Sequence, residues 1–77
     1  MADTQYLDRY LIALMRKVRE DQYPSMLQMD MVEEMLPPEA VDLWLEVLFE
    51  KIEADHYPSV DMLRRVQRNV ARSLAVA

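Results

Sequence analysis

The chain has 77 residues, of which 9 are Lys or Arg and 14 are Asp or Glu, and its formal net charge at pH 7 is -5. It contains no glycine and no cysteine, which excludes disulfides, thiolate chemistry, Cys-containing zinc sites and the glycine-rich loops that bind phosphates or dinucleotides. A chain of this length has room for one small domain, so we expect residues 1–77 to form a single all-helical domain.

The first predicted element is a helix from about Thr4 to about Glu20. Its apolar side chains recur at spacings of three and four residues, which places them on one helix face. The residues of this face are Leu7, Tyr10, Leu11, Leu14 and Val18. Pro24 is expected to stop the chain from continuing as a helix, because proline disfavours the helical backbone for the residue before it.

The second predicted element is a helix that begins after Ser25 and ends at Leu36. The Ser25 hydroxyl is suited to cap its first turn, and Gln28 three residues later completes the pattern of a capping box. The segment is rich in methionine, an unbranched side chain that suits adaptable partner-binding surfaces. Helical geometry turns one set of apolar residues inward and leaves another set partly outside. The inward set is Met29, Val32 and Leu36, and the outer candidates are Met31, Met35 or Leu27.

The third predicted helix begins at Pro38, where the missing N–H of proline costs no hydrogen bond. The fourth begins after a second serine cap at Ser59. Both helices show apolar residues at helical spacing. The inward residues expected are Val41, Trp44, Leu45, Leu48 and Ile52 in the third helix and Leu63, Val66, Val70 and Leu74 in the fourth. No segment of the sequence has the alternating pattern of a strand.

The sequence also aligns with itself at an offset of 34 positions. Residues 8–36 then face residues 42–70 with nine identical pairs, and the densest match pairs residues 21–25 with residues 55–59. The matches preserve both the apolar spacing and the turn residues, which favours a tandem duplication. The predicted fold is therefore all-α: a small four-helix bundle built from two tandemly related helical hairpins, one over about 4–36 and one over about 38–75.

Charge is segregated along the chain. Residues 20–61 hold twelve acids and one base, a net charge of -11, while the segments before and after carry +2 and +4. On the third predicted helix the acids recur every three or four residues and form a stripe. We expect this stripe and the outer methionines to bind a basic partner protein. The predicted partner-binding residues are Met31, Met35, Glu39, Asp42, Glu46, Glu50 and Glu53.

Other interpretations of these surfaces stay open. The charged stripes are also consistent with solvated helix faces, and methionine also fills irregular cores. A further alternative is a head-to-tail contact between the acidic edge of one copy and the basic edge of another. The high apolar share of 52% favours a second chain covering part of the surface, so we expect a homodimer.

The basic fourth helix raises a second kind of function. The third helix, the turn and the fourth helix superficially resemble a DNA-binding helix-turn-helix, because the fourth helix carries several arginines. The alternative nucleic-acid contacts are Arg64, Arg65, Arg68 and Arg72. The sequence pI of about 4.7 is opposite to the basic footprint of a nucleic-acid binder, so we expect no nucleic-acid partner. The same acidity leaves open a DNA-mimic inhibitor that acts through the acidic block.

Catalysis and metal binding have little support in the sequence. Glu53 and His56 match the Glu-x-x-His spacing of metal-binding bundles, but the corresponding positions of the first hairpin supply no second imidazole. A metal site would then have to be assembled across a dimer, which is the third alternative. Ser25 and Ser59 are explained as helix caps instead of nucleophiles. We therefore expect no catalytic residue, no metal and no cofactor, and a protein that is not an enzyme.

The compartment is inferred from what the sequence lacks. No apolar stretch approaches the length of about 18 residues that spans a bilayer. The segment Met1-Ala2-Asp3-Thr4 has neither the basic start nor the apolar core of a secretory signal. We expect a cytoplasmic protein that interacts with another protein and with no membrane.

Overall fold

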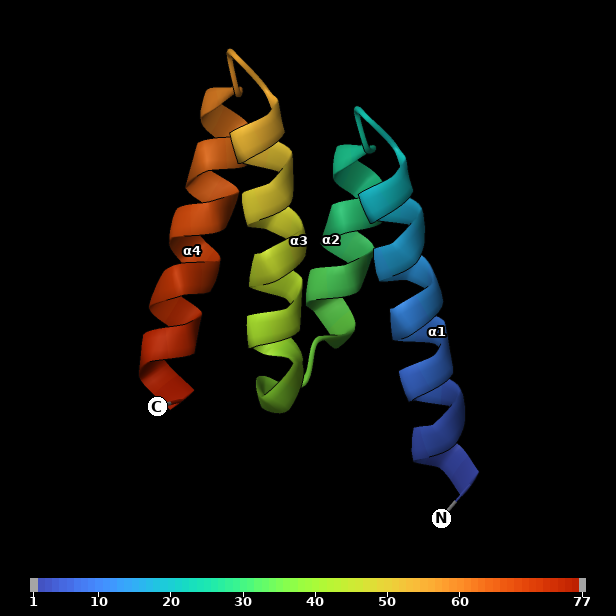
Figure 1. Ribbon diagram of the computed structural model, residues 1–77. Coiled ribbons are helices and arrows are strands. Elements are labelled where there is room, and N and C mark those ends of the chain that lie inside the picture. The colour runs from blue at the N-terminus through green and yellow to red at the C-terminus, as the bar shows by residue number, and fades with distance from the viewer. Residues whose placement is uncertain (1, 77) are drawn as a thin grey trace. The chain divides into compact units, whose positions relative to one another are not determined.

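The computed structural model describes the backbone of residues 2–76 and the side chains of residues 5–75. This part of the chain is helical, with no strand, as the sequence predicts (Figure 1). The α-helices are α1 (Ala2–Glu20), α2 (Met26–Met35), α3 (Val41–Ala54) and α4 (Val60–Val76), and a short 3-10 turn, η1 (Pro38–Ala40), precedes α3. The prediction of an all-α chain with four helices is confirmed.

The chain divides into two compact units, Met1–Leu36 and Pro37–Ala77. In unit 1, α1 packs against α2, and in unit 2, α3 packs against α4. Each unit is a helical hairpin whose two helices are joined by a tight turn (Figure 1). The two hairpins are described separately below.

The turn of each hairpin is held by the same hydrogen bonds. In unit 1 the Asp21 carboxylate oxygen Oδ1 accepts from the backbone N–H of Tyr23 at 3.1 Å, and in unit 2 Asp55 Oδ1 accepts from the N–H of Tyr57 at 3.0 Å. An aspartate that bonds the backbone two residues later forms an Asx-turn, which reverses the chain without glycine. All described residues accordingly have negative φ angles.

Serine caps then start the second helix of each hairpin. Ser25 Oγ accepts from the N–H of Gln28 at 3.2 Å, and Ser59 Oγ accepts from the N–H of Met62 at 3.1 Å. Each bond satisfies one of the first N–H groups of a helix, which have no partner within the helix itself. Both predicted caps are confirmed.

In unit 1 the buried apolar residues come from one face of each helix. They are Leu11, Met15 and Val18 on α1 and Met29, Val32 and Leu36 at α2 and its end. The inward set predicted for the second helix is therefore confirmed. On α1 the prediction is wrong at Tyr10, which is exposed, while Met15 takes a buried place that the sequence analysis did not assign.

In unit 2 the third helix begins later than predicted. Residues Pro38–Ala40 form a 3-10 turn in which the N–H of Ala40 donates to the carbonyl of Pro37 at 3.0 Å, and the α-helix starts at Val41. No side chain caps the start of the 3-10 turn. The backbone i to i+3 hydrogen bond instead satisfies one of the first N–H groups of this helical segment. The buried apolar residues of the unit are Val41, Trp44, Val47, Leu48 and Val66.

The inward face of α4 differs from the prediction. Leu63 and Leu74 were expected inside but are 45% and 72% exposed, and the polar residues Arg65 and Asn69 are buried instead. The side-chain amide of Asn69 donates to the carbonyl of Arg65 at 2.8 Å, which provides a partner for a polar group that would be costly to bury alone. The apolar spacing alone therefore misplaced the inward face of α4.

Candidate interaction surfaces

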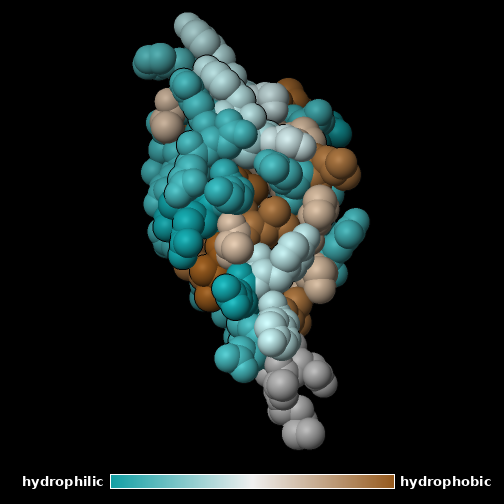
Figure 2. All heavy atoms as spheres, turned by 90° about the vertical axis from the view of Figure 1, so that its right-hand side faces the viewer, coloured by the Kyte–Doolittle hydropathy of each residue, from teal (hydrophilic) through white to brown (hydrophobic). Residues whose placement is uncertain are grey.

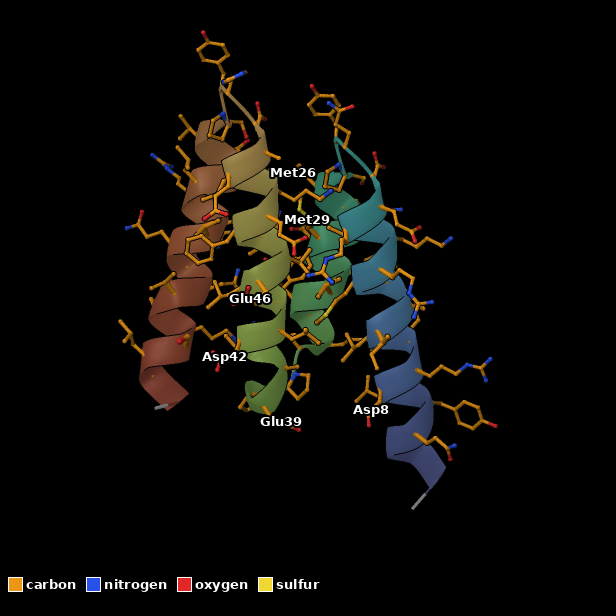
Figure 3. The ribbon with its side chains drawn as sticks, viewed as in Figure 1. Asp8, Met26, Met29, Glu39, Asp42 and Glu46 are labelled. Atoms are coloured by element: carbon orange, nitrogen blue, oxygen red, sulfur yellow. The ribbon has the colours of Figure 1, made fainter. Side chains whose placement is uncertain are left out.

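The five acids of the predicted partner-binding stripe follow one another along η1 and α3, and all are exposed. We call them the acidic stripe: Glu39, Asp42, Glu46, Glu50 and Glu53. The successive positions of Glu39, Asp42 and Glu46 can be followed in Figure 3. From Asp42 onward the steps of three and four residues keep the carboxylates on one side of the helix.

Most of the acidic stripe is without an ion pair in the described chain. Glu50 takes part in an interaction within the protein. Among the described residues the structure records no salt bridge or hydrogen bond for Asp42, Glu46 or Glu53. Their carboxylates are therefore available to cationic groups on another molecule.

Large apolar side chains border the acidic stripe on α3. Leu43 and Phe49 are both exposed, although α3 buries four other apolar residues. By helical geometry Leu43 lies on one side of the stripe and Phe49 on the other. An exposed apolar side chain beside charges is typical of the centre and rim of a protein interface. The sequence analysis did not single out Phe49, although its spacing from Glu46 and Glu53 was a readable signal.

The outer face of α2 is apolar in unit 1. Leu27, Met31 and Met35 are exposed, as the sequence predicts for the side turned away from Met29, Val32 and Leu36. Met26 is exposed as well, and it labels the start of α2 in Figure 3. Figure 2 views the molecule from the side of α1, and on that side hydrophobic spheres lie among hydrophilic ones. Met31 and Met35 belong to unit 1 and the acidic stripe belongs to unit 2, so each part of the predicted surface is described by itself.

The predicted nucleic-acid contacts of α4 lie in different environments. Arg64 and Arg68 are exposed, Arg72 is half-buried, and Arg65 is only 4% exposed. A buried guanidinium is unavailable to a phosphate or a base edge, so the predicted nucleic-acid contact at Arg65 is wrong. Arg64 and Arg68 instead line an open hollow of about 380 Å³ together with Gln67 and Ala71.

The residues considered for metal binding do not gather into a site. In the described part of the chain, no group of three or more His, Cys, Asp or Glu side chains could hold a metal ion. His56 is exposed in the turn of unit 2, where its ring lies 6.2 Å from that of Tyr57. Glu53 is exposed on α3. Ser25 and Ser59 serve as helix caps, so the geometry assigns them a structural role.

Comparison of the chain with protein-family models, with curated proteins and with solved structures finds no match. Across residues 2–76, no helix combines the length and the apolar character needed to cross a membrane. Three features of the described surface are suited to contact with another molecule: the acidic stripe, the apolar face of α2 and the arginine-lined hollow of α4.

Proposed function

We propose that this chain is a small cytoplasmic protein-protein interaction module, homodimeric, that binds a basic partner through the acidic stripe and the apolar face of α2. The observation that carries the proposal is that Asp42, Glu46 and Glu53, exposed and without a recorded ion pair among the described residues, lie on α3 beside exposed large apolar side chains. These apolar side chains are Leu43 and Phe49. Apolar side chains supply contact area on binding, while complementary charge selects the partner and raises the association rate.

The composition of α2 supports the same function. Apolar residues occur on nearly all sides of this helix, from Leu27 and Met31 outside to Met29 and Val32 inside. A helix that is apolar all round is typically covered on all sides. The unbranched side chains of Met31 and Met35 can adapt to the shape of the molecule that covers them.

For the architecture we propose a four-helix bundle of two hairpins related by duplication. The shared turn chemistry supports it, since Asp21 and Asp55 each bond the tyrosine two residues later, and Ser25 and Ser59 each cap the next helix. Independent hairpins have no physical need to use the same five-residue turn. Duplication accounts for both the sequence match and the matching hydrogen bonds.

A DNA-associated regulator is the second candidate, because Arg64 and Arg68 lie exposed one turn apart on α4. The burial of Arg65 and the net charge of -5 both weigh against it, since DNA binding depends on neutralising several phosphates. A DNA-mimic inhibitor would use the acidic stripe itself and differs from the leading proposal only in the partner, which would be a nucleic-acid-binding protein.

Affinity capture from the native cell with two matched baits tests the proposal. The first bait carries Asp42→Lys with Glu46→Lys in the acidic stripe, and the control carries Asp8→Lys with Glu20→Lys, two exposed acids of α1. The charge change is the same in both. We expect the stripe variant to lose the basic partner that the wild type and the control retain. Equal recovery of the same proteins by all three baits would refute the role of the acidic stripe.

A further inference from the structure

The hollow on α4 has the arrangement of a helix-packing site. Its four lining residues are Arg64, Gln67, Arg68 and Ala71. They stand at positions i, i+3, i+4 and i+7 of one helix, and residues with these spacings are neighbours on a helix surface. Four such neighbours form the hole that receives one side chain of a facing helix in knobs-into-holes packing. The hollow is therefore suited to a helix, and we call it the α4 hole.

The chemistry of the α4 hole restricts what can enter. Arg64 and Arg68 form two cationic corners, and the small side chain of Ala71 leaves room beside them. Both arginines are exposed, and among the described residues the structure shows no ion pair for either of them. Guanidinium groups stack on aromatic rings and pair with carboxylates. The best knob is thus an aromatic side chain with acids beside it on the same helix face.

Phe49 on α3 meets this description. Its side chain is 38% exposed. Glu46 lies three residues before it and Glu53 four residues after it, so both carboxylates flank the ring on the surface of α3. Facing the α4 hole, the ring would lie against guanidinium groups while the two acids reach the arginine corners.

We infer that the α4 hole of one copy of this chain receives Phe49 of a second copy. The inference rests on the proposed function, because it names the partner of the acidic stripe. The contact joins two different surfaces of the chain. When it is made twice about a twofold axis the interface is isologous and closes a dimer, and when it is made once between each pair of copies it is heterologous and continues into rings or larger assemblies.

Two other occupants of the α4 hole fit less well. A second copy of α4 would bring arginines against arginines, and juxtaposed like charges are unfavourable. The exposed Leu27 of α2 has Asp30 and Glu34 beside it at helical spacing, but Asp30 already takes part in an interaction within the chain. For Glu46 and Glu53, the acids that flank Phe49, the structure records no such interaction among the described residues.

Charge reversal with mixing tests the contact, with light scattering of the full chain as the measurement. Glu46→Arg with Glu53→Arg makes the acidic side basic, and Arg64→Glu with Arg68→Glu makes the arginine side acidic. Each variant alone is expected to dissociate, with a dissociation constant raised by about tenfold or more. An equimolar mixture is expected to associate again, because opposite charges then meet at every contact between the two variants.

The knob and the hole are tested without changing charge. Phe49→Ala removes the knob, and Ala71→Phe fills the hole at an exposed position where the fold has room for a larger side chain. We expect each to weaken self-association by about tenfold or more, while circular dichroism shows an unchanged helix content. If Phe49→Ala unfolds the chain, the self-association of Ala71→Phe alone tests whether the α4 hole is part of the contact.

The controls place the same charge changes on α1. Arg9→Glu with Arg16→Glu and Asp8→Arg with Glu20→Arg alter exposed residues outside the contact and are expected to leave association unchanged. A monomeric wild type, or a mixture of the reversed variants that stays monomeric, would overturn the inference. Loss of association in Leu27→Ala but not in Phe49→Ala would also overturn it and assign the α4 hole to α2. A monomeric wild type that still loses a basic partner on Asp42→Lys with Glu46→Lys would leave the proposed binding of a basic partner standing and would remove the homodimer together with this inference.

Discussion

The side-chain amide of Asn69 donates a buried hydrogen bond of 2.8 Å to the backbone carbonyl of Arg65, one turn earlier in α4. Both residues are almost fully buried, so this helix turns a polar pair inward and leaves Leu63 and Leu74 outside. A polar group placed in a hairpin interior requires hydrogen bonds to offset the loss of water. The outward residues Leu63 and Leu74 and the neighbouring Arg64 are exposed on the opposite part of the helix surface.

Removing the buried amide is expected to destabilise the chain. Asn69→Ala should lower the free energy of unfolding by about 1–2 kcal/mol, because the buried hydrogen bond is lost and a small void remains. The comparison is Gln67→Ala, an exposed amide on the same helix, for which we expect a change within about 0.5 kcal/mol. Urea unfolding followed by circular dichroism measures both, and equal effects would contradict the inward placement of Asn69.

A pair of leucines tests the observed burial. Leu48 is fully buried on α3, whereas Leu74 is exposed on α4. Leu48→Ala should cost about 2–5 kcal/mol, which is enough to unfold much of a chain this small, because a single small core rarely supplies more than about 3–5 kcal/mol. Leu74→Ala should change the free energy of unfolding by no more than about 0.5 kcal/mol. A large destabilisation by Leu74→Ala in the unassociated chain would restore the inward face predicted from the sequence.

The two serine caps are expected to contribute equally and independently. Ser25→Ala and Ser59→Ala should each lower the free energy of unfolding by about 1 kcal/mol, because each removes the acceptor for one N–H at the start of a helix. The caps have no shared hydrogen-bond partner and lie in different units, so the double variant should lose about 2 kcal/mol. Thermal unfolding of the three variants measures these losses. If only one of the two serine substitutions lowered the stability, the two turns would not be equivalent.

The contribution of the Asx-turn hydrogen bond to the stability of unit 2 can be measured separately from that of the Asp55 charge. Asp55→Ala removes the oxygen that accepts the N–H of Tyr57 and should cost about 0.5–1.5 kcal/mol. Asp55→Asn keeps a side-chain oxygen and should recover most of that loss. If the asparagine variant were as unstable as the alanine variant in urea, the charge of Asp55 would matter more than the hydrogen bond.

Sequence periodicity predicts the helices well because their ends carry chemistry that can be read directly. Pro24, Ser25 and Ser59 each act locally, through the backbone of the preceding residue or the first turn of a helix. The methionines of α2 were also sorted correctly into a buried and an exposed set, since Met29 and Val32 share one side of that helix. Local rules therefore account for the two hairpin turns, for the starts of α2 and α4 and for the faces of α2.

The faces of α4 were beyond the reach of the same rules. The apolar residues of this helix lie on one side, but the buried side is turned from it toward Arg65 and Asn69, and the inward side depends on what α3 presents to it. A search for apolar spacing selects Leu63 and Leu74 and cannot anticipate that Asn69 is satisfied by the carbonyl of Arg65. The α4 hole was missed for a related reason: it is defined by Gln67 and Ala71 as much as by the arginines, and neither residue attracts attention in a sequence.

The molar mass of the full chain in solution, measured by light scattering at two salt concentrations, tests the central claim most directly. At about 0.1 M salt, where the screening length is about 10 Å, we predict at least twice the single-chain mass of 9.1 kDa. At about 1 M salt the screening length falls to about 3 Å, and the mass should shift toward that of one chain because the contact depends on Glu46, Glu53, Arg64 and Arg68. A mass of 9.1 kDa at both salt concentrations would contradict the account.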